Sequence, residues 1–145
     1  MNGNITSLQR NGDTEDASTV IMIDDLTYTY DTNSNKLVSV TDATNHPSGF
    51  TPSSTPLLQD AYEYDAYGNL TKDRHKGITN IIYNHLHQPK ELFVSNGTHT
   101  GSISYLYDAN GKKVQKQVME NQQLRTTDYL NSFQYLDGSL DFVHR

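Results

Sequence analysis

Two histidines separated by one residue are the first candidates for chemistry in this sequence of 145 residues. His85 and His87 would share one face of an extended strand, because successive side chains alternate between the two faces. Metal sites use this spacing, and His75, His99 or an aspartate could add a third ligand. The sequence fixes no such ligand. We therefore interpret the pair as exposed strand histidines beside the turn at Gln88-Pro89 and predict no metal site.

A second candidate for metal binding is an acidic and amide-rich segment. Asp31, Asn33 and Asn35 occupy the first, third and fifth places of a calcium-loop pattern, and Asp42 occupies the twelfth. The sixth place, where the sharp turn requires glycine, is Lys36. Asn and Asp also favour turns through their tolerance of left-handed backbone. We therefore predict a turn without calcium.

The sequence offers no clear candidates for catalysis by paired carboxylates or by an activated nucleophile. Asp24 and Asp25 are adjacent, so in a strand their side chains point to opposite faces. Serine and threonine are plentiful, but no Gly-x-Ser-x-Gly motif accompanies them, and the chain has no cysteine. We predict no catalytic residue, no cofactor and no enzymatic activity. A hydrolase would need a pocket of converging polar groups that the sequence does not predict.

Tyrosines are the strongest candidates for binding. A Tyr-x-Tyr-Asp frame occurs three times in the chain. Exposed aromatic rows can stack on sugar rings, while rings buried against one another form cross-strand contacts. We favour the buried arrangement, because only 34% of the residues are apolar and the core needs the rings. The residues that could stack on a ligand are Tyr28, Tyr30, Tyr62, Tyr64, Tyr105 and Tyr107.

The elements that position these residues are predicted to be β-strands. Apolar and aromatic residues alternate with polar ones through Leu26–Tyr30 and Ile103–Tyr107, a pattern typical of a half-buried strand. Turn residues follow each aromatic strand, and Asn110-Gly111 predicts a type I′ hairpin turn. No segment shows a sustained helical period. We expect an all-β fold of consecutive antiparallel β-hairpin repeats that form one curved, twisted sheet.

The repeats are uneven, and this defines the organisation of the chain. We predict a single repeat array over residues 1–145, with an excursion rich in Pro, Ser and Thr at 43–60. A degenerate copy begins at Tyr83-Asn84, with Asn in place of Asp and Gln88-Pro89 where other copies have Gly. An atypical C-terminal unit covers 127–145. Exposed sheet edges favour either self-association or a local closure by the excursion and the C-terminal unit.

Composition excludes several classes of partner. A net charge of −6 argues against nucleic acid, which needs clustered Lys and Arg. No apolar run approaches the length of a membrane span, and the start of the chain shows no secretory signal. We expect no nucleic acid partner and no membrane insertion.

The repeat motifs resemble the RHS/YD repeat family. Tyr-Asp-Ala-Tyr-Gly-Asn-Leu-Thr-Lys at 64–72 and Tyr-Asp-Ala-Asn-Gly-Lys-Lys-Val at 107–114 look like its units, and the likeness covers Leu26 to Val118. Residues 1–5 resemble the tail of a preceding unit. Residues 129–145 are similar to the stretch that enters the conserved core in Bacteroidetes-like members. The aspartate-rich self-cleavage motif of that core is absent here.

The resemblance implies a structural role. Complete family members form a spiral β-shell around a C-terminal toxin or other cargo, and some are described as carbohydrate-binding. This chain looks like a fragment that ends before the core, a partial RHS/YD shell. We expect a structural wall segment of a large secreted or cell-surface protein, whose partners are the rest of that protein or its cargo. The alternative is a carbohydrate- or protein-binding module that uses the aromatic rows.

Overall fold

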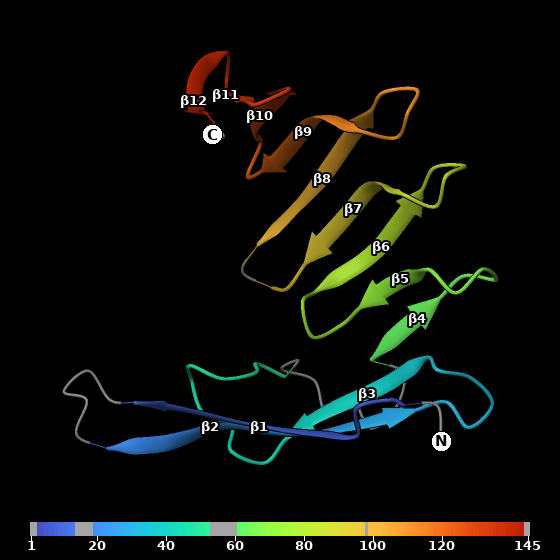
Figure 1. Ribbon diagram of the computed structural model, residues 1–145, viewed down its shortest axis with the longest axis vertical. Helices are drawn as coiled ribbons and strands as arrows, with labels where there is room; N and C mark the ends of the chain where they lie inside the picture. Colours follow the sequence, from blue (N-terminus) through green and yellow to red (C-terminus); the bar gives the residue numbers. More distant parts are fainter. Residues whose placement is uncertain (1–2, 14–18, 53–60, 98, 144–145) are drawn as a thin grey trace.

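The computed structural model describes residues 3–13, 19–52, 61–97 and 99–143, and within these ranges its regular elements are β-strands (Figure 1). The strands are β1 (Ser7–Asp13), β2 (Val20–Tyr30), β3 (Leu37–Asp42), β4 (Tyr62–Tyr64), β5 (Leu70–Asp73), β6 (Ile78–Tyr83), β7 (Pro89–Ser95), β8 (Thr100–Tyr107), β9 (Lys113–Glu120), β10 (Gln123–Leu130), β11 (Phe133–Leu136) and β12 (Ser139–Val143). Each pairs antiparallel with its neighbours in the sheet.

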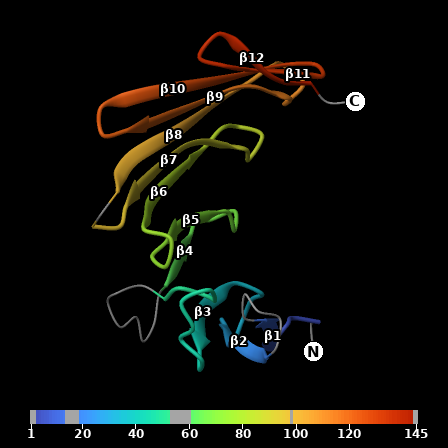
Figure 2. The ribbon, with the colours of Figure 1, turned by 90° about the vertical axis from the view of Figure 1, so that its left-hand side faces the viewer.

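The strands follow one another in space in the order in which they follow in the chain. β1, β2 and β3 form a three-stranded sheet, and β4 to β12 form a nine-stranded sheet. Seen from the side, the strands bend into an arc (Figure 2). This confirms the predicted all-β array of consecutive antiparallel hairpins and its curvature, whereas the one sheet that was expected is divided into two. The backbone ladder is interrupted between β3 and β4, where the excursion enters the chain.

The loop after each aromatic strand is organised by its Asp. In the copy after β8, the Asp108 carboxylate accepts the backbone N–H groups of Asn110 and Lys112, both at 2.9 Å. The Asp108 N–H donates to the Lys112 carbonyl at 2.9 Å, so the loop spans five residues. The predicted type I′ turn at Asn110-Gly111 is therefore wrong, since of these two residues Gly111 alone has a positive φ, +78°.

The degenerate copy keeps the same loop geometry. The Asn84 side-chain oxygen accepts the N–H groups of Leu86 and Gln88 at 2.9 and 3.0 Å, as the Asp oxygens do elsewhere. The place of the loop glycine is taken by His87, with φ +57°, rather than by Gln88-Pro89 as expected. Pro89 begins β7 instead. Asn can replace Asp here because an amide oxygen accepts the same hydrogen bonds.

True two-residue turns occur toward the C-terminus. Asn121 and Gln122 join β9 to β10 with φ +49° and +65°, the pair of positive angles that a type I′ turn requires. Asp137 and Gly138 join β11 to β12 in the same way, with φ +48° and +82°. Both connections are thus two-residue turns. All five residues of β12 are exposed.

The described part of the excursion, residues 43–52, returns along β2. The Thr44 hydroxyl donates to the Ile23 carbonyl at 2.8 Å, and the Phe50 N–H donates to the Asp24 carboxylate at 2.6 Å. Both contacts cap the side of β2 beyond the end of β3. The rest of the predicted excursion, 53–60, lies outside the described residues.

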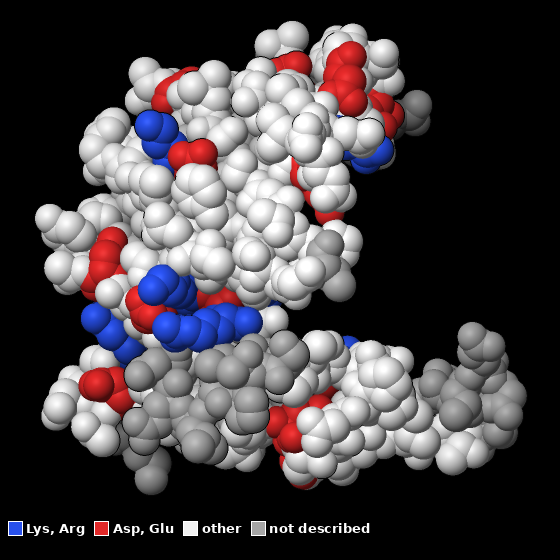
Figure 3. All heavy atoms as spheres, turned by 180° about the vertical axis from the view of Figure 1, so that it is seen from behind, with Lys and Arg blue, Asp and Glu red and all other residues white. Residues whose placement is uncertain are grey.

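Apolar burial is sparse, and charges on the surface are mixed. Leu26, Val40, Ala61 and Ile81 are the buried apolar residues of the described chain. The back of the molecule shows basic and acidic side chains side by side rather than a patch of one sign (Figure 3). Glu63, for example, pairs with Lys72 at 2.8 Å and with Arg74 at 2.6 Å.

Candidate functional site

The six tyrosines considered for ligand stacking lie in three strands and are all half-buried. Tyr28 and Tyr30 lie in β2, Tyr62 and Tyr64 in β4, and Tyr105 and Tyr107 in β8. Members of a pair share a face of their strand. The ring centroids of Tyr105 and Tyr107 are 6.4 Å apart, and the Lys113 ammonium lies 4.7 Å from the Tyr105 centroid. Side chains of the chain itself therefore cover part of these rings.

The tyrosine directly before each loop Asp or Asn donates its hydroxyl to the preceding unit. The acceptors are backbone carbonyls: Tyr30 to Ile5 (2.9 Å), Tyr64 to Leu37 (3.0 Å), Tyr83 to Leu70 (2.7 Å) and Tyr107 to Pro89 (2.8 Å). Leu37, Leu70 and Pro89 are the first residues of β3, β5 and β7. We call this series the hydroxyl ladder. It continues across the gap between β3 and β4, where the backbone ladder does not.

The loops are joined by a second series of contacts, the loop ladder. Its donors are four residues that follow a residue with positive φ at the glycine place, and each contacts the next loop or turn along the chain. The contacts are Asn4 to Asn35 (3.2 Å), Asn69 to His87 (3.0 Å), Gln88 to Gly111 (2.7 Å) and Lys112 to Asn131 (3.5 Å). Gly3 has a positive φ, +72°, as Gly68 has, +88°, and Asn4 follows Gly3 as Asn69 follows Gly68.

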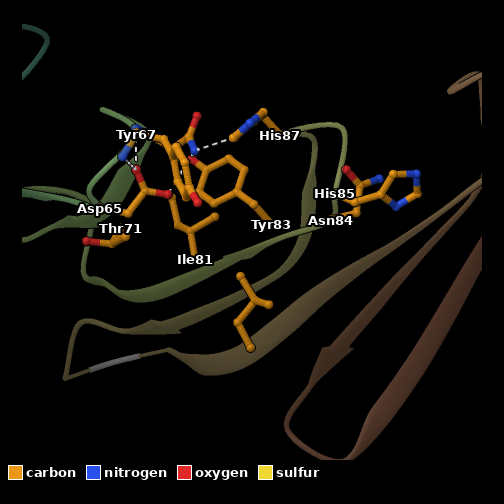
Figure 4. Close-up of a pocket in the computed structure, with 10 residues that line it drawn as sticks. Asp65, Tyr67, Thr71, Ile81, Tyr83, Asn84, His85 and His87 are labelled. Carbon is orange, nitrogen blue, oxygen red and sulfur yellow. Dashed lines mark hydrogen bonds between the residues drawn. The ribbon is translucent and has the colours of Figure 1, made fainter.

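A hollow of about 500 Å³ lies on this loop side, between the loop after β4 and strand β6 (Figure 4). Tyr67, which is 80% exposed, packs edge-on against His87 with ring centroids 5.1 Å apart. Tyr83 forms part of the wall. The Asp65 carboxylate accepts the N–H groups of Tyr67 and Asn69, so it holds the loop in place. The Asn69 side-chain amide also donates to this carboxylate at 2.8 Å and is the main cause of the lowered pKa of Asp65, to which the backbone N–H groups add.

A second cavity, of about 440 Å³, lies at the junction of the two sheets. Leu26 of β2 and Val40 of β3 form one wall, and Tyr62 of β4 and Asp73 of β5 form the other. Asp73 is buried, with 4% of its surface exposed. Its carboxylate accepts the Lys76 N–H at 3.2 Å. We call this space the junction cavity.

Aromatic rings enclose the far side of the junction cavity. The His75 ring lies 5.0 Å from Phe50 and 5.7 Å from Tyr62, centroid to centroid. Burial lowers the pKa of His75, although the Asp73 charge acts in the opposite direction. Burial, aided by the Asp73 charge, raises the pKa of Tyr62 to about 12. At neutral pH both side chains are therefore uncharged.

The residues considered for metal binding are not brought together. His85 and His87 lie in the loop between β6 and β7 rather than on a strand face, and they project to different sides of it (Figure 4). The Asp31 carboxylate accepts the Asn33 N–H at 2.8 Å, as a turn residue does. Within the described ranges, no group of three or more His, Asp or Glu side chains could hold a metal ion.

The adjacent carboxylates Asp24 and Asp25 serve different structural roles. Asp24 is buried and pairs with Arg10, and this contact is the main cause of its lowered pKa. Asp25 accepts the Gln9 amide at 3.1 Å. Their separation follows from the alternation of side chains along β2.

Sequence reasoning did not identify the junction cavity. Asp73 ends β5 and His75 lies in the turn that follows, within a charged stretch that matches no motif, and Phe50 lies in the excursion. Tyr67 lies in the repeat motif at 64–72 but is not one of the six tyrosines considered for ligand stacking. The sole signal was an apolar-face position occupied by a carboxylate, since Asp73 pairs with Tyr62 across β4 and β5.

Comparison with protein-family models, with curated proteins and with solved structures gives no match for this chain. No helix in the described part of the chain is long and apolar enough to span a membrane. The function must therefore be inferred from the contacts and cavities of the chain.

Proposed function

We propose that the chain is a structural scaffold, a wall segment of a large secreted or cell-surface protein of the RHS/YD type. In this role the hairpins extend a curved sheet that encloses a toxin or other cargo. The partners of the segment are the remainder of that protein and the enclosed cargo. Chemistry is supplied elsewhere, and the tyrosines hold the wall together.

The hydroxyl ladder is the observation that carries this proposal. Each of its bonds joins one hairpin to the one before it, at an equivalent place in four successive units. A ligand-binding surface needs its polar groups free for the ligand, whereas a wall needs them engaged between units. Half-buried tyrosines suit this use because the ring packs while the hydroxyl bonds at the edge.

The loop ladder supports the same role. Amide and lysine side chains of one loop bond to the next loop, so the loop edge of the array is held as well as its middle. Contacts between neighbouring units only are typical of repeat architectures, whose purpose is to extend a surface.

The test is to identify the native polypeptide that contains this sequence. An antibody against residues 61–143 would identify the native product, and limited proteolysis would probe whether a cargo segment is protected. We expect a polypeptide much larger than 16.4 kDa, with a protected fragment that becomes cleavable when Tyr83 and Tyr107 are changed to Phe. Two results would contradict the proposal. One is a free chain of 16.4 kDa as the sole product. The other is a fragment that stays protected from the protease after Tyr83 and Tyr107 are changed to Phe.

A second candidate function is carbohydrate or protein binding, and the exposed Tyr67 ring above the loop hollow favours it. A glycan array tests it directly. Binding that disappears on Tyr67→Ala, or on Tyr→Ala changes in one aromatic row, would support a binding module. Binding that survives these changes, or no binding at all, would favour the scaffold.

A further inference from the structure

We propose that the junction cavity binds a small organic monocation, with an ammonium head held by Asp73 and the surrounding rings and an apolar body held between the sheets. This inference is independent of the scaffold role. It rests on the shape, charge and aromatic lining of one cavity in the described chain.

The size and lining of the cavity suit a small molecule. Its volume of about 440 Å³ lies within the range of about 300–1,000 Å³ that is usual for ligand sites. Leu26, Leu37, Val40 and Leu70 supply apolar wall from both sheets. Such sites combine a mainly apolar lining with a few placed polar groups. Because no backbone ladder joins β3 to β4, a ligand here would bridge two sheets that are otherwise held by side chains.

The charge of the cavity selects a cation. Asp73 is its buried carboxylate, with 6% of the side chain exposed. A buried charge is costly unless it is compensated. Its compensation here is partial, since the Lys76 ammonium lies 3.9 Å away on a side chain that is 76% exposed. His75 and Tyr62 add no positive charge at neutral pH. The net charge of −6 would also attract a cation to the surface.

The rings provide the second element of cation recognition. Phe50, Tyr28, Tyr62 and Tyr64 all line the cavity, and aromatic faces attract ammonium groups within about 6 Å. The chain already uses its tyrosines in this way. The Lys36 ammonium lies 5.7 Å from the Tyr64 ring centroid. Quaternary ammonium groups suit such a site best, because they lose little hydration on entering it.

The Asp73 charge reaches the rings that would surround the ligand. Burial is the main cause of the raised pKa values of Tyr62 and Tyr64 and of the lowered pKa of His75; the Asp73 charge adds to the first two and opposes the third. Asp73 and these three rings also line the same cavity. An ammonium head placed there would contact both at once.

The experiment compares a cation with its uncharged isostere on the full chain. Choline and 3,3-dimethyl-1-butanol have the same shape and differ in the charged nitrogen, and benzyltrimethylammonium adds an aromatic body. Calorimetry and tyrosine fluorescence would follow binding. We expect choline to bind at least tenfold more tightly than the alcohol and benzyltrimethylammonium to bind more tightly still. Equal affinity of choline and the alcohol, or no binding of either cation at about 10 mM, would overturn the proposal.

Two variants locate the site. Asp73→Asn keeps the size of the side chain and should weaken choline at least tenfold while leaving the alcohol unchanged. Lys76→Gln removes the exposed competitor and should tighten choline several-fold. Circular dichroism and the melting temperature report whether each variant is folded. If Asp73→Asn does not fold, the Lys76→Gln variant tests the proposal instead. A choline affinity that is unchanged by Lys76→Gln would then overturn it.

Discussion

The hydroxyl ladder makes a sharp prediction about stability. Changing Tyr83 to Phe removes one oxygen and leaves the ring in place. The lost hydrogen bond, 2.7 Å to the Leu70 carbonyl, is the shortest of the four in the ladder. It joins β6 to the start of β5, strands whose described register consists of one residue pair, Asp73 with Ile78. The side-chain bond therefore supplements a short backbone ladder.

The magnitude follows from the environment of the bond. A hydrogen bond in a protein contributes about 0.5–1.5 kcal/mol net to the free energy of unfolding. Tyr83 is half-buried, so water can replace part of the loss, and we expect about 1 kcal/mol for Tyr83→Phe. The four ladder positions share no hydrogen-bond partner, so their effects should add. Phe at all four should cost about 2–6 kcal/mol, a large part of the 5–15 kcal/mol typical of a domain.

Urea denaturation followed by circular dichroism measures this cost. With a slope of about 1–3 kcal/mol per molar urea, a loss of 1 kcal/mol lowers the midpoint by about 0.3–1 M. Tyr67→Phe is the matched control, since the Tyr67 side chain is 80% exposed and lies outside the ladder. We expect it to shift the free energy by less than about 0.5 kcal/mol. If Tyr83→Phe and Tyr67→Phe had the same small effect, the ladder would not stabilise the array.

Three further predictions concern the loops and the junction. Asp108→Ala should cost about 1–2 kcal/mol in urea denaturation because two backbone N–H groups lose their acceptor, whereas Asp108→Asn should be nearly neutral, and equal costs would refute this role of the oxygen. Gly111→Ala and Gly68→Ala should each lower the free energy of unfolding by about 1–2 kcal/mol, because an alanine is strained at a positive φ. Gly111→Ala should cost more in the same assay, since its added Cβ meets the Gln88 amide at 3.2 Å while that of Gly68 meets open space. The lowered pKa of His75 means that the unfolded chain binds more protons, so stability should fall as pH drops below about 6.5. His75→Phe should remove the fall in stability below about pH 6.5 and leave the loss of stability near pH 4. If the melting temperature depended on pH in the same way with and without His75→Phe, His75 would not be the group responsible.

Much of the fold follows from local sequence because hairpins are local structures. Alternation at Ile103–Tyr107 indicates which residues share a face, and Asp or Asn directly after the last tyrosine of a strand indicates where its loop begins. The residue types needed at each loop place were less visible. In the degenerate copy, His87 adopts the left-handed region that usually favours glycine. The glycine place therefore lies one residue before the Gln88-Pro89 pair where the sequence pattern puts it.

The junction cavity could not be predicted, because it is made by distant residues. Leu26, Phe50, Tyr62 and Asp73 come from separate elements, and periodicity says which face a residue occupies but not what lies opposite. The gap between β3 and β4 was equally hidden. Proline marks a departure from the sheet, yet it does not say whether the ladder resumes on the same strand edge.

The two ladders also explain where the array changes character. In β8 the frame is Tyr105-Leu106-Tyr107, whereas in β10 it is Tyr129-Leu130-Asn131. Asn131 stands at the place of the second tyrosine, with φ +53°, and begins a two-residue turn in place of a five-residue loop. It still accepts the loop-ladder contact from Lys112 at 3.5 Å, but it carries no phenol to donate to the preceding unit.

Beyond Asn131 the strands are joined by a tight turn and by backbone pairing, and Leu140 and Phe142 are 57% and 52% exposed. In the units with a five-residue loop this place holds a tyrosine whose hydroxyl reaches the unit behind it, whereas Asn131 at the same place has no hydroxyl to donate. The identity of this single residue thus decides whether a hairpin is bonded to the array through its side chains or continues it through its backbone alone.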